Sequence, residues 1–350
     1  MSEQLNKFGM GARFISASQL DEVDLGPLKQ LVGEWETVVL PPVAGTTAPT
    51  PAGWNVISVP NKEKGFIFEV IPYKENLKFS AVAVEAGNRG PILNGNAFDQ
   101  QITGLFYEQQ IISVCDTDFC NARGFANGTV IHAETGLFLY ITNYNSGLNL
   151  ARLGTVPHGN SLMALGKNIE STDPGTTFFP SVSPVAFNLD GSAPGGFGYN
   201  ENIILAPQFT EFNQVEPNSF LQSTLQQIVG ATGSVTAMTT LDLTTKNPDA
   251  TGGILNIPFI ESNVRATTMD VTYWLETITG GSETELLQYS QTVNLVFPIT
   301  GSVTPIVWPH ISISTLKRMQ PVPIPGQAAD FEALKSSAPS PGNTPGVPQL

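Results

Sequence analysis

The three histidines of this 350-residue chain are the side chains with the clearest capacity for chemistry. His132 lies in the run Val130-Ile-His-Ala-Glu-Thr-Gly136, where strand alternation puts His132 and Glu134 on the same face. The carboxylate could fix one tautomer of the imidazole, or both groups could line a pocket. The alternative is a solvent-facing pair of residues ahead of a hairpin turn.

The other two histidines lie in different settings. His158 is part of Val156-Pro-His-Gly-Asn160, which is typical of an exposed turn between strands. His310 follows Trp308-Pro309 and precedes the strand-like run Ile311-Ser-Ile-Ser-Thr-Leu316. A proline there indicates a sheet edge or a bulge, which would aim the next side chain in a particular direction.

An apolar barrel with inward histidines is a sensible container for haem, because neutral imidazole ligates iron while aromatic and aliphatic walls bury the porphyrin. Residue chemistry alone indicates only that an apolar-ligand barrel is possible. The sequence contains no Gly-rich phosphate loop, nucleophile elbow, His-Glu-x-x-His motif or dinucleotide fingerprint, so most common enzyme classes lose their support.

Short runs rich in Val, Ile, Phe and Tyr would position these side chains, and turn residues such as Tyr73-Lys-Glu-Asn76 and Glu134-Thr-Gly136 separate them. Close neighbours should pair as antiparallel hairpins. In the run 285–297, Leu287 and Tyr289 fall on one face and Gln288 and Ser290 on the other, which predicts one core face and one wet face. The predicted strands are 55–59, 65–71, 77–85, 101–107, 109–115, 129–133, 137–142, 161–167, 234–245, 265–279, 285–297 and 305–316.

The remaining segments complete a predominantly β domain. A helical turn should pack Leu28 and Leu31 before a strand that starts near Trp35, and the spacing in 217–229 predicts the best helix of the chain. We expect loops over 41–52 and 171–200. The predicted organisation is a flexible arm over 1–24, one β domain over 25–318, and a disordered Pro-rich tail over 319–350.

Charge and targeting signals narrow the possible partners. The formal net charge of -14 disfavours nucleic acid and anionic membranes as partners. The sequence has neither an N-terminal signal-peptide stretch nor a run of ~18 apolar residues, so we expect a cytoplasmic protein without membrane insertion. Cys115 and Cys120 are then expected to be free thiols.

Six blocks of this sequence resemble a bacterial family of haem-binding proteins that is distantly similar to the nitrobindins. The resemblance spans roughly 25–318, judged by where the blocks fall. It implies a calycin-like barrel of the fatty-acid-binding-protein type: all-β, single, large and antiparallel, with long loop insertions and one short helix. The blocks are Leu31-Val-Gly-Glu-Trp35, His132-Ala-Glu-Thr-Gly-Leu-Phe-Leu139, Asn256-Ile-Pro-Phe-Ile260, Tyr273-Trp-Leu-Glu-Thr277, Leu287-Gln-Tyr-Ser-Gln-Thr292 and Trp308-Pro-His-Ile-Ser312.

The resemblance also implies functional residues. Nitrobindins ligate haem iron through a histidine on a late strand, which corresponds by position to His310, and their His-Ala-Glu segment lies near the pocket. The expected site is therefore His310 as the iron ligand, with His132, Glu134 and Trp308 around the haem. Peroxidase-like or reactive-nitrogen chemistry would be possible there. The alternatives are a haem-free carrier of a fatty acid or another apolar molecule, and a structural scaffold; a homodimer is also possible.

Overall fold

The computed structural model of the protein describes residues 23–42, 50–61, 65–90, 92–142, 147–156, 158–171, 179–193, 203–204, 209, 211–246, 252–297 and 305–319. All of these belong to one compact unit, Met1–Met319. Most of the predicted N-terminal arm, and the predicted tail beyond residue 319, lie outside the described residues. The predicted domain boundaries therefore stay a prediction.

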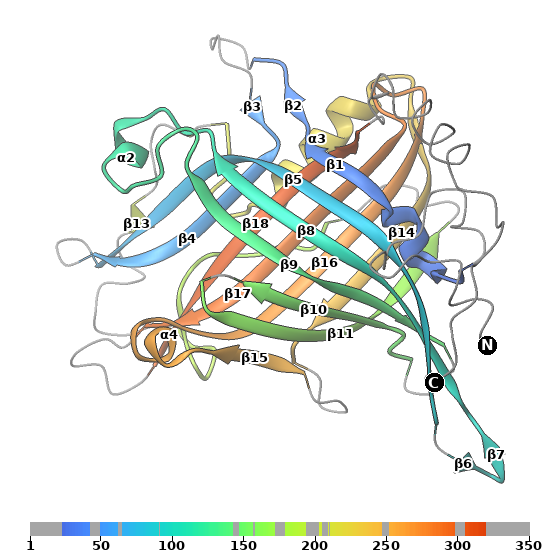
Figure 1. Cartoon of the computed structure of the whole chain (residues 1–350). Coiled ribbons are helices and arrows are strands. Elements are labelled where there is room, and N and C mark those ends of the chain that lie inside the picture. Colours follow the sequence, from blue (N-terminus) through green and yellow to red (C-terminus); the bar gives the residue numbers. More distant parts are fainter. Residues whose placement is uncertain are drawn as a thin grey trace, which may run out of the picture. The chain divides into compact units, whose positions relative to one another are not determined.

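Ten strands of the described residues close into one antiparallel barrel, in the order β1-β18-β17-β16-β14-β11-β10-β9-β8-β5, and β5 pairs again with β1 (Figure 1). This confirms the predicted all-β class and the single antiparallel barrel. The barrel strands are β1 (Gly33–Thr37), β5 (Gly65–Asn88), β8 (Gln100–Ser113), β9 (Val130–Ile141), β10 (Leu150–Val156), β11 (Asn160–Ser171), β14 (Ser234–Thr244), β16 (Arg265–Thr279), β17 (Glu285–Val296) and β18 (Ile306–Arg318).

Smaller elements extend this barrel. The 12-residue helix α3 (Asn218–Val229) matches the prediction, and two shorter helices, α2 (Asp118–Asn121) and α4 (Pro258–Asn263), accompany it. Among the helices that the structure describes, none has the length and apolarity needed to cross a membrane. The additional strands are β2 (Val39–Leu40), β3 (Thr50–Pro51), β4 (Gly53–Asn61), β6 (Ile92–Leu93), β7 (Asn96–Ala97), β12 (Phe187–Asn188), β13 (Ile203–Ile204) and β15 (Gly253–Asn256).

Two strands share the seam between β5 and β18. β1 pairs with one part of both strands, whereas β4 pairs with Ser314 to His310 of β18 and with Tyr73 to Gly65 of β5. Between β1 and β4, the backbone N–H of Val38 donates to the Thr315 carbonyl, and the N–H of Thr315 donates to the Ala52 carbonyl. The barrel is therefore closed by β1 and β4 together.

The inner core is closed at one end by the 3-10 helix η2 (Gly26–Leu31). Leu28 and Leu31 are fully buried, as the sequence predicts, and they join an apolar cluster that includes Phe79 and Phe138 on the inner face of the barrel. The indole nitrogen of Trp35 donates to the Leu31 carbonyl at 2.8 Å. We call this side of the barrel the plugged end.

A second apolar core covers part of the outer face of the barrel, beneath α3. Trp274 and Leu286 point outward from β16 and β17 and pack with Leu225 of α3. Gln288 is also fully buried, and its side-chain nitrogen donates to the Leu221 carbonyl at 3.1 Å. The prediction of a wet face on 285–297 is therefore wrong, because α3 covers the face that carries the polar residues.

Several predicted strands are longer than expected because two predicted turns are strand. Tyr73-Lys-Glu-Asn76 lies inside β5, and Glu134-Thr-Gly136 lies inside β9. The register places Tyr73, Glu75 and Glu134 on the inner face, where other polar groups bind them. In the sequence these polar residues indicate turns, but in the fold their side chains make buried hydrogen bonds inside the barrel.

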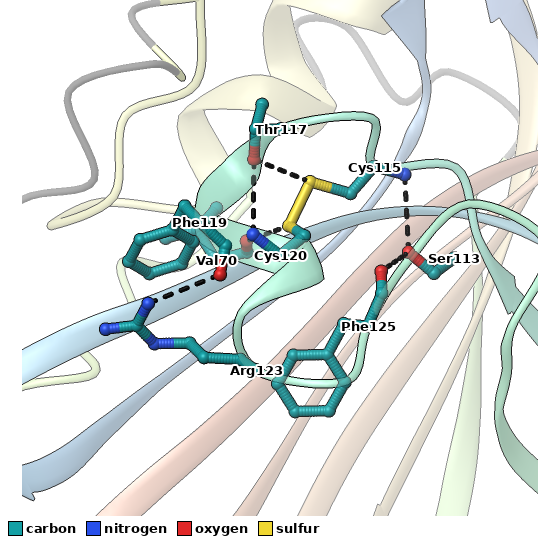
Figure 2. The surroundings of a disulfide bond; sticks show 8 residues. All are labelled: Val70, Ser113, Cys115, Thr117, Phe119, Cys120, Arg123 and Phe125. Carbon is teal, nitrogen blue, oxygen red and sulfur yellow. Dashed lines mark hydrogen bonds between the residues drawn. A yellow bond between two sulfur atoms is a disulfide. The ribbon is translucent and has the colours of Figure 1, made fainter.

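Cys115 and Cys120 form a disulfide, which corrects the expectation of free thiols (Figure 2). The side chain of Thr117 caps α2 by accepting from the backbone N–H of Cys120, and this turn brings the two cysteine Cα atoms to 6.0 Å. Both cysteines are buried in the outer core. The expectation of free thiols rested only on the expected cytoplasmic location. The turn around α2 instead brings the two cysteines close enough to pair.

Candidate functional site

His132 and Glu134 point into the barrel from β9, as the alternation of the strand predicts. The Glu134 side chain is only 1% exposed, and the His132 side chain is 24% exposed. His132 Nε2 lies 3.4 Å from Glu134 Oε2. The pair is therefore an inner-wall pair with an accessible imidazole, and the alternative of a solvent-facing pair before a turn is wrong.

Arg152 of β10 is the centre of a buried polar network. Its guanidinium lies 2.9 Å from Glu134 Oε1 and donates to the hydroxyl of Tyr273 at 2.8 Å and to Gln291 Oε1 at 2.7 Å. The hydroxyl of Tyr107 accepts from Arg152 and donates to Glu134. Four partners thus surround a side chain that is 1% exposed, which satisfies the requirement that a buried charge be paired and hydrogen-bonded.

The ion pair sets the charge states within this network. Burial opposes ionisation of Glu134, but the charge of Arg152 and hydrogen bonds from His132 and Tyr107 outweigh it and lower the pKa of Glu134 to about 2. Burial raises the pKa of Tyr273 to about 12 despite the opposing effect of Arg152. At neutral pH the network therefore holds one carboxylate, one guanidinium and neutral phenols.

Glycines make room for this network. A Cβ atom at position 154 would collide with the Glu134 carboxylate and the Tyr107 hydroxyl, and one at 136 would meet the Leu153 carbonyl and the Tyr107 ring. Close packing around the ion pair, rather than a turn, therefore explains why glycine occupies position 136 of β9.

A second carboxylate, Glu75 of β5, is buried beside the first network. Tyr289 donates to Glu75 Oε2 at 2.8 Å, and the Gln109 amide donates to Oε1 at 2.7 Å. The hydroxyl groups of Tyr73 and Tyr289 lie 3.0 Å apart. Burial raises the pKa of Glu75, although hydrogen bonds from Gln109 and Tyr289 partly offset it.

His310 points inward from β18, opposite Asn55 of β4. The Asn55 side-chain nitrogen lies 2.5 Å from His310 Nε2 and 3.3 Å from the hydroxyl of Ser312. The Asn55 oxygen is buried without a hydrogen-bond partner. Trp308 has the same strand parity as His310, but it is fully buried in the apolar cluster that also contains Trp54 and Trp274, with its ring centroid 6.1 Å from that of Phe297.

The fold brings all three histidines to the end of the barrel opposite η2, which we call the histidine end. His158 lies exposed in the turn between β10 and β11, and its ring centroid is 5.6 Å from that of His132. Burial, with the charges of His132 and His158, lowers the pKa of His310 to about 4. Burial and the charge of His132 also lower the pKa of His158. At neutral pH, His310 is therefore the neutral imidazole.

Inner-face side chains are packed differently at the two ends. Near η2 most of them are fully buried, whereas at the histidine end several apolar inner-face side chains are only half-buried. These accessible apolar side chains are Ile57, Val59, Ile67 and Val293. Ile57 and Val293 lie opposite His310 on the neighbouring strands, so this end offers both an apolar surface and imidazole groups.

Other sites are less suited to a buried ligand. Within the described part of the chain, no set of three or more His, Cys, Asp or Glu side chains is arranged to hold a bare metal ion. Two depressions of about 490 and 570 Å³ lie away from His310, one beside β15 and α4 and one across β1, β5, β8 and β9. The histidine end is the candidate site because it combines inward orientation, apolar walls and ligating side chains.

Sequence reasoning found part of this site. It placed His132 and Glu134 on one face, which the structure confirms, whereas the roles it gave to His310 and Trp308 stay a prediction; it omitted Arg152 and its tyrosine partners. The run Leu150-Ala-Arg-Leu-Gly-Thr-Val156 contains a signal for a buried cation. Strand alternation puts Arg152 on the same face as the uncharged residues Leu150, Gly154 and Val156.

Comparisons with known proteins give little further guidance. No family model matches the chain, and no curated protein matches it. Among solved structures, it is similar to the crystal structure of Rv2717c from M. tuberculosis, with 16% sequence identity and a TM-score of 0.36, over 85% of this chain and 100% of that one. The barrel is therefore argued from its own strand pairing, and the resemblance to haem-binding proteins stays a prediction.

Proposed function

We propose that this protein binds haem at the histidine end of the barrel, with His310 as the iron ligand. The observation that carries the proposal is the convergence of all three histidines of the chain on one end of the barrel, where half-buried apolar side chains also lie. Neutral imidazole is the form that ligates iron, and the pKa of about 4 keeps His310 neutral at physiological pH.

The residues around His310 fit such a group. Ile57 and Val293 occupy positions opposite His310 on the neighbouring strands and supply apolar wall for a porphyrin. The unpartnered Asn55 oxygen next to the imidazole is a buried acceptor that a donor group on the ring or on a bound ligand would satisfy. Asn55 also holds Nε2 of His310, so ligation through that nitrogen requires the amide to withdraw.

Bound haem would supply an open coordination position for a small ligand such as a peroxide or a nitrogen oxide. The residues of this chain would exclude water through the apolar wall and keep the guanidinium of Arg152 neutralised by Glu134. A fatty-acid carboxylate has less to bind, because Arg152 already has four partners.

The test is a titration of the purified protein with hemin, followed by visible absorption. We expect a saturable one-to-one Soret shift for the wild type that His310→Ala abolishes or moves. Because the pKa of His310 is about 4, the shift should be constant from pH 6 to 8 and should fade as the pH falls through about 4. The matched control is His158→Ala, the same change at an exposed turn, which should keep the wild-type Soret position.

Each other outcome identifies an alternative. A wild-type protein with no Soret shift refutes haem binding, and an unchanged spectrum in His310→Ala removes that residue from the ligand role. Mass spectrometry of solvent extracts would then separate the alternatives: a lipid without porphyrin supports the apolar carrier. Concentration-dependent self-association without any bound molecule supports the structural scaffold, and it would also reveal a homodimer.

A further inference from the structure

Glu276 is a buried carboxyl group for which the described structure provides no partner. It is 2% exposed, and neither carboxyl oxygen makes a hydrogen bond. It points outward from β16 into the outer core, opposite Met238 of β14 and Leu286 of β17, with Trp274 and Ile278 before and after it on the same face. An isolated carboxylate is very unfavourable in such surroundings, so the group must keep its proton.

Helix α3 covers this part of the sheet. The Gln288 amide donates to the Leu221 carbonyl near the start of the helix, and the backbone N–H of Ser282 donates to the Ile228 carbonyl near its end. The middle of α3, with Thr224, therefore lies over the stretch of β17 that contains the partner of Glu276. The Thr224 hydroxyl and the Gln288 side-chain oxygen are also buried without partners, so few polar bonds hold this interface.

No cation faces Glu276 from the described elements packed around it. Helix α3 has no charged residue, and neither has the segment 179–188 that covers the outer core. On β14 the nearest charged side chain on this face is Asp242, four residues after Met238. Asp242 accepts a hydrogen bond from Thr272, its partner on β16. On β18 the nearest charged side chain on this face is Lys317, which pairs with Leu286 and is therefore separated from Glu276 by β17. The Lys317 amine lies 3.7 Å from the carboxylate of Glu36 and 3.7 Å from that of Glu283.

We propose that Glu276 is a pH-sensitive latch for helix α3: the protonated carboxyl allows α3 to pack on β16 and β17, and loss of its proton to bulk water releases the helix. The inference does not depend on haem binding, because the latch lies on the outer face of the barrel. Burial raises the pKa of Glu276 well above its usual range and outweighs the opposing effect of the residue's own backbone N–H. The packed state therefore binds the proton more tightly than the open state.

The sign of the effect follows from this linkage. Below the ordinary pKa of 4.5 both states are protonated, and the pH has no effect on the latch. Above it, the open state releases a proton that the packed state keeps, so opening becomes more favourable as the pH rises. The equilibrium constant for opening should increase about tenfold per pH unit until Glu276 ionises in the packed state as well.

Hydrogen exchange of the α3 backbone, measured by mass spectrometry on peptides covering 218–229, tests the latch. After correction for the intrinsic exchange rate, the wild type should show the tenfold rise in opening per pH unit, and Glu276→Gln should remove it. Glu108→Gln, the same change at an exposed position of β8, should leave the wild-type slope. A slope retained in Glu276→Gln, or absent from the wild type, would overturn the proposal.

A second measurement keeps the proposal testable if Glu276→Gln does not fold. The carboxyl carbon of Glu276 can be titrated by NMR in the wild-type protein. A proton retained through pH 7 supports the latch, whereas titration near the ordinary value of 4.5 refutes it.

Discussion

Removing Arg152 should be among the most destabilising single changes in this protein, because it leaves Glu134 as a buried charge without a cation. Both side chains are 1% exposed. Breaking a buried ion pair from one side costs about 3–5 kcal/mol. The electrostatics agree: lowering the pKa of Glu134 from 4.5 to about 2 corresponds to roughly 3 kcal/mol.

The assay is urea unfolding of Arg152→Met followed by tryptophan fluorescence, since Trp35, Trp54, Trp274 and Trp308 are all buried. The matched control is Arg265→Met, whose guanidinium is 48% exposed and pairs with Glu261 on the surface. Exposed pairs contribute about 0–1 kcal/mol, so this variant should stay close to the wild type. A loss below about 1 kcal/mol for Arg152→Met would refute the reasoning.

The pH dependence gives an independent check. In the wild type, the contribution of Glu134 is present above pH 4.5 and is lost as the pH falls through about 2. In Arg152→Met, burial acts on Glu134 without the opposing cation, so its pKa should rise above the ordinary value. Stability should then decrease as the pH rises above 4.5, the reverse of the wild type, and Glu134→Gln in the same variant should remove that dependence.

Further predictions concern the plug and the disulfide. Leu28→Ala in η2, at a fully buried position, should lower the free energy of unfolding by about 2–5 kcal/mol in urea titrations, whereas the half-buried Val293→Ala at the histidine end should cost less; equal losses would contradict the packing difference between the two ends. Replacing Cys115 and Cys120 together by serine should cost about 2 kcal/mol, because the loop they close is short. Thiol counting of the denatured, unreduced protein should detect no free thiol, and two free thiols would contradict the pairing.

The sequence predicted the local elements of the fold well where the apolar pattern was long and regular. The predicted strand 265–279 coincides with β16, and the predicted helix over 217–229 is α3. Alternation also placed His132 and Glu134 on one face of β9. In each case one property of nearby residues, their periodicity, was enough.

The errors arise where distant parts of the chain decide the outcome. Glu75 and Gly136 looked like turn residues because the pattern of one strand does not reveal that other strands supply partners for a buried carboxylate or need space for a tyrosine. The polar face of β17 looked wet because only the fold places α3 over it. Arg152 was missed for the same reason, since its four partners come from β8, β9, β16 and β17.

The shared seam between β5 and β18 constrains the order in which the protein can form. β1 and β4 are made early in synthesis, but one edge of each must wait for β18, more than 240 residues later, before it gains a partner. Until then the nascent chain exposes unpaired strand edges, which promote aggregation. Fragments that end before β18 should therefore need a chaperone or aggregate, whereas the loss of residues after 319 should leave closure of the barrel unaffected.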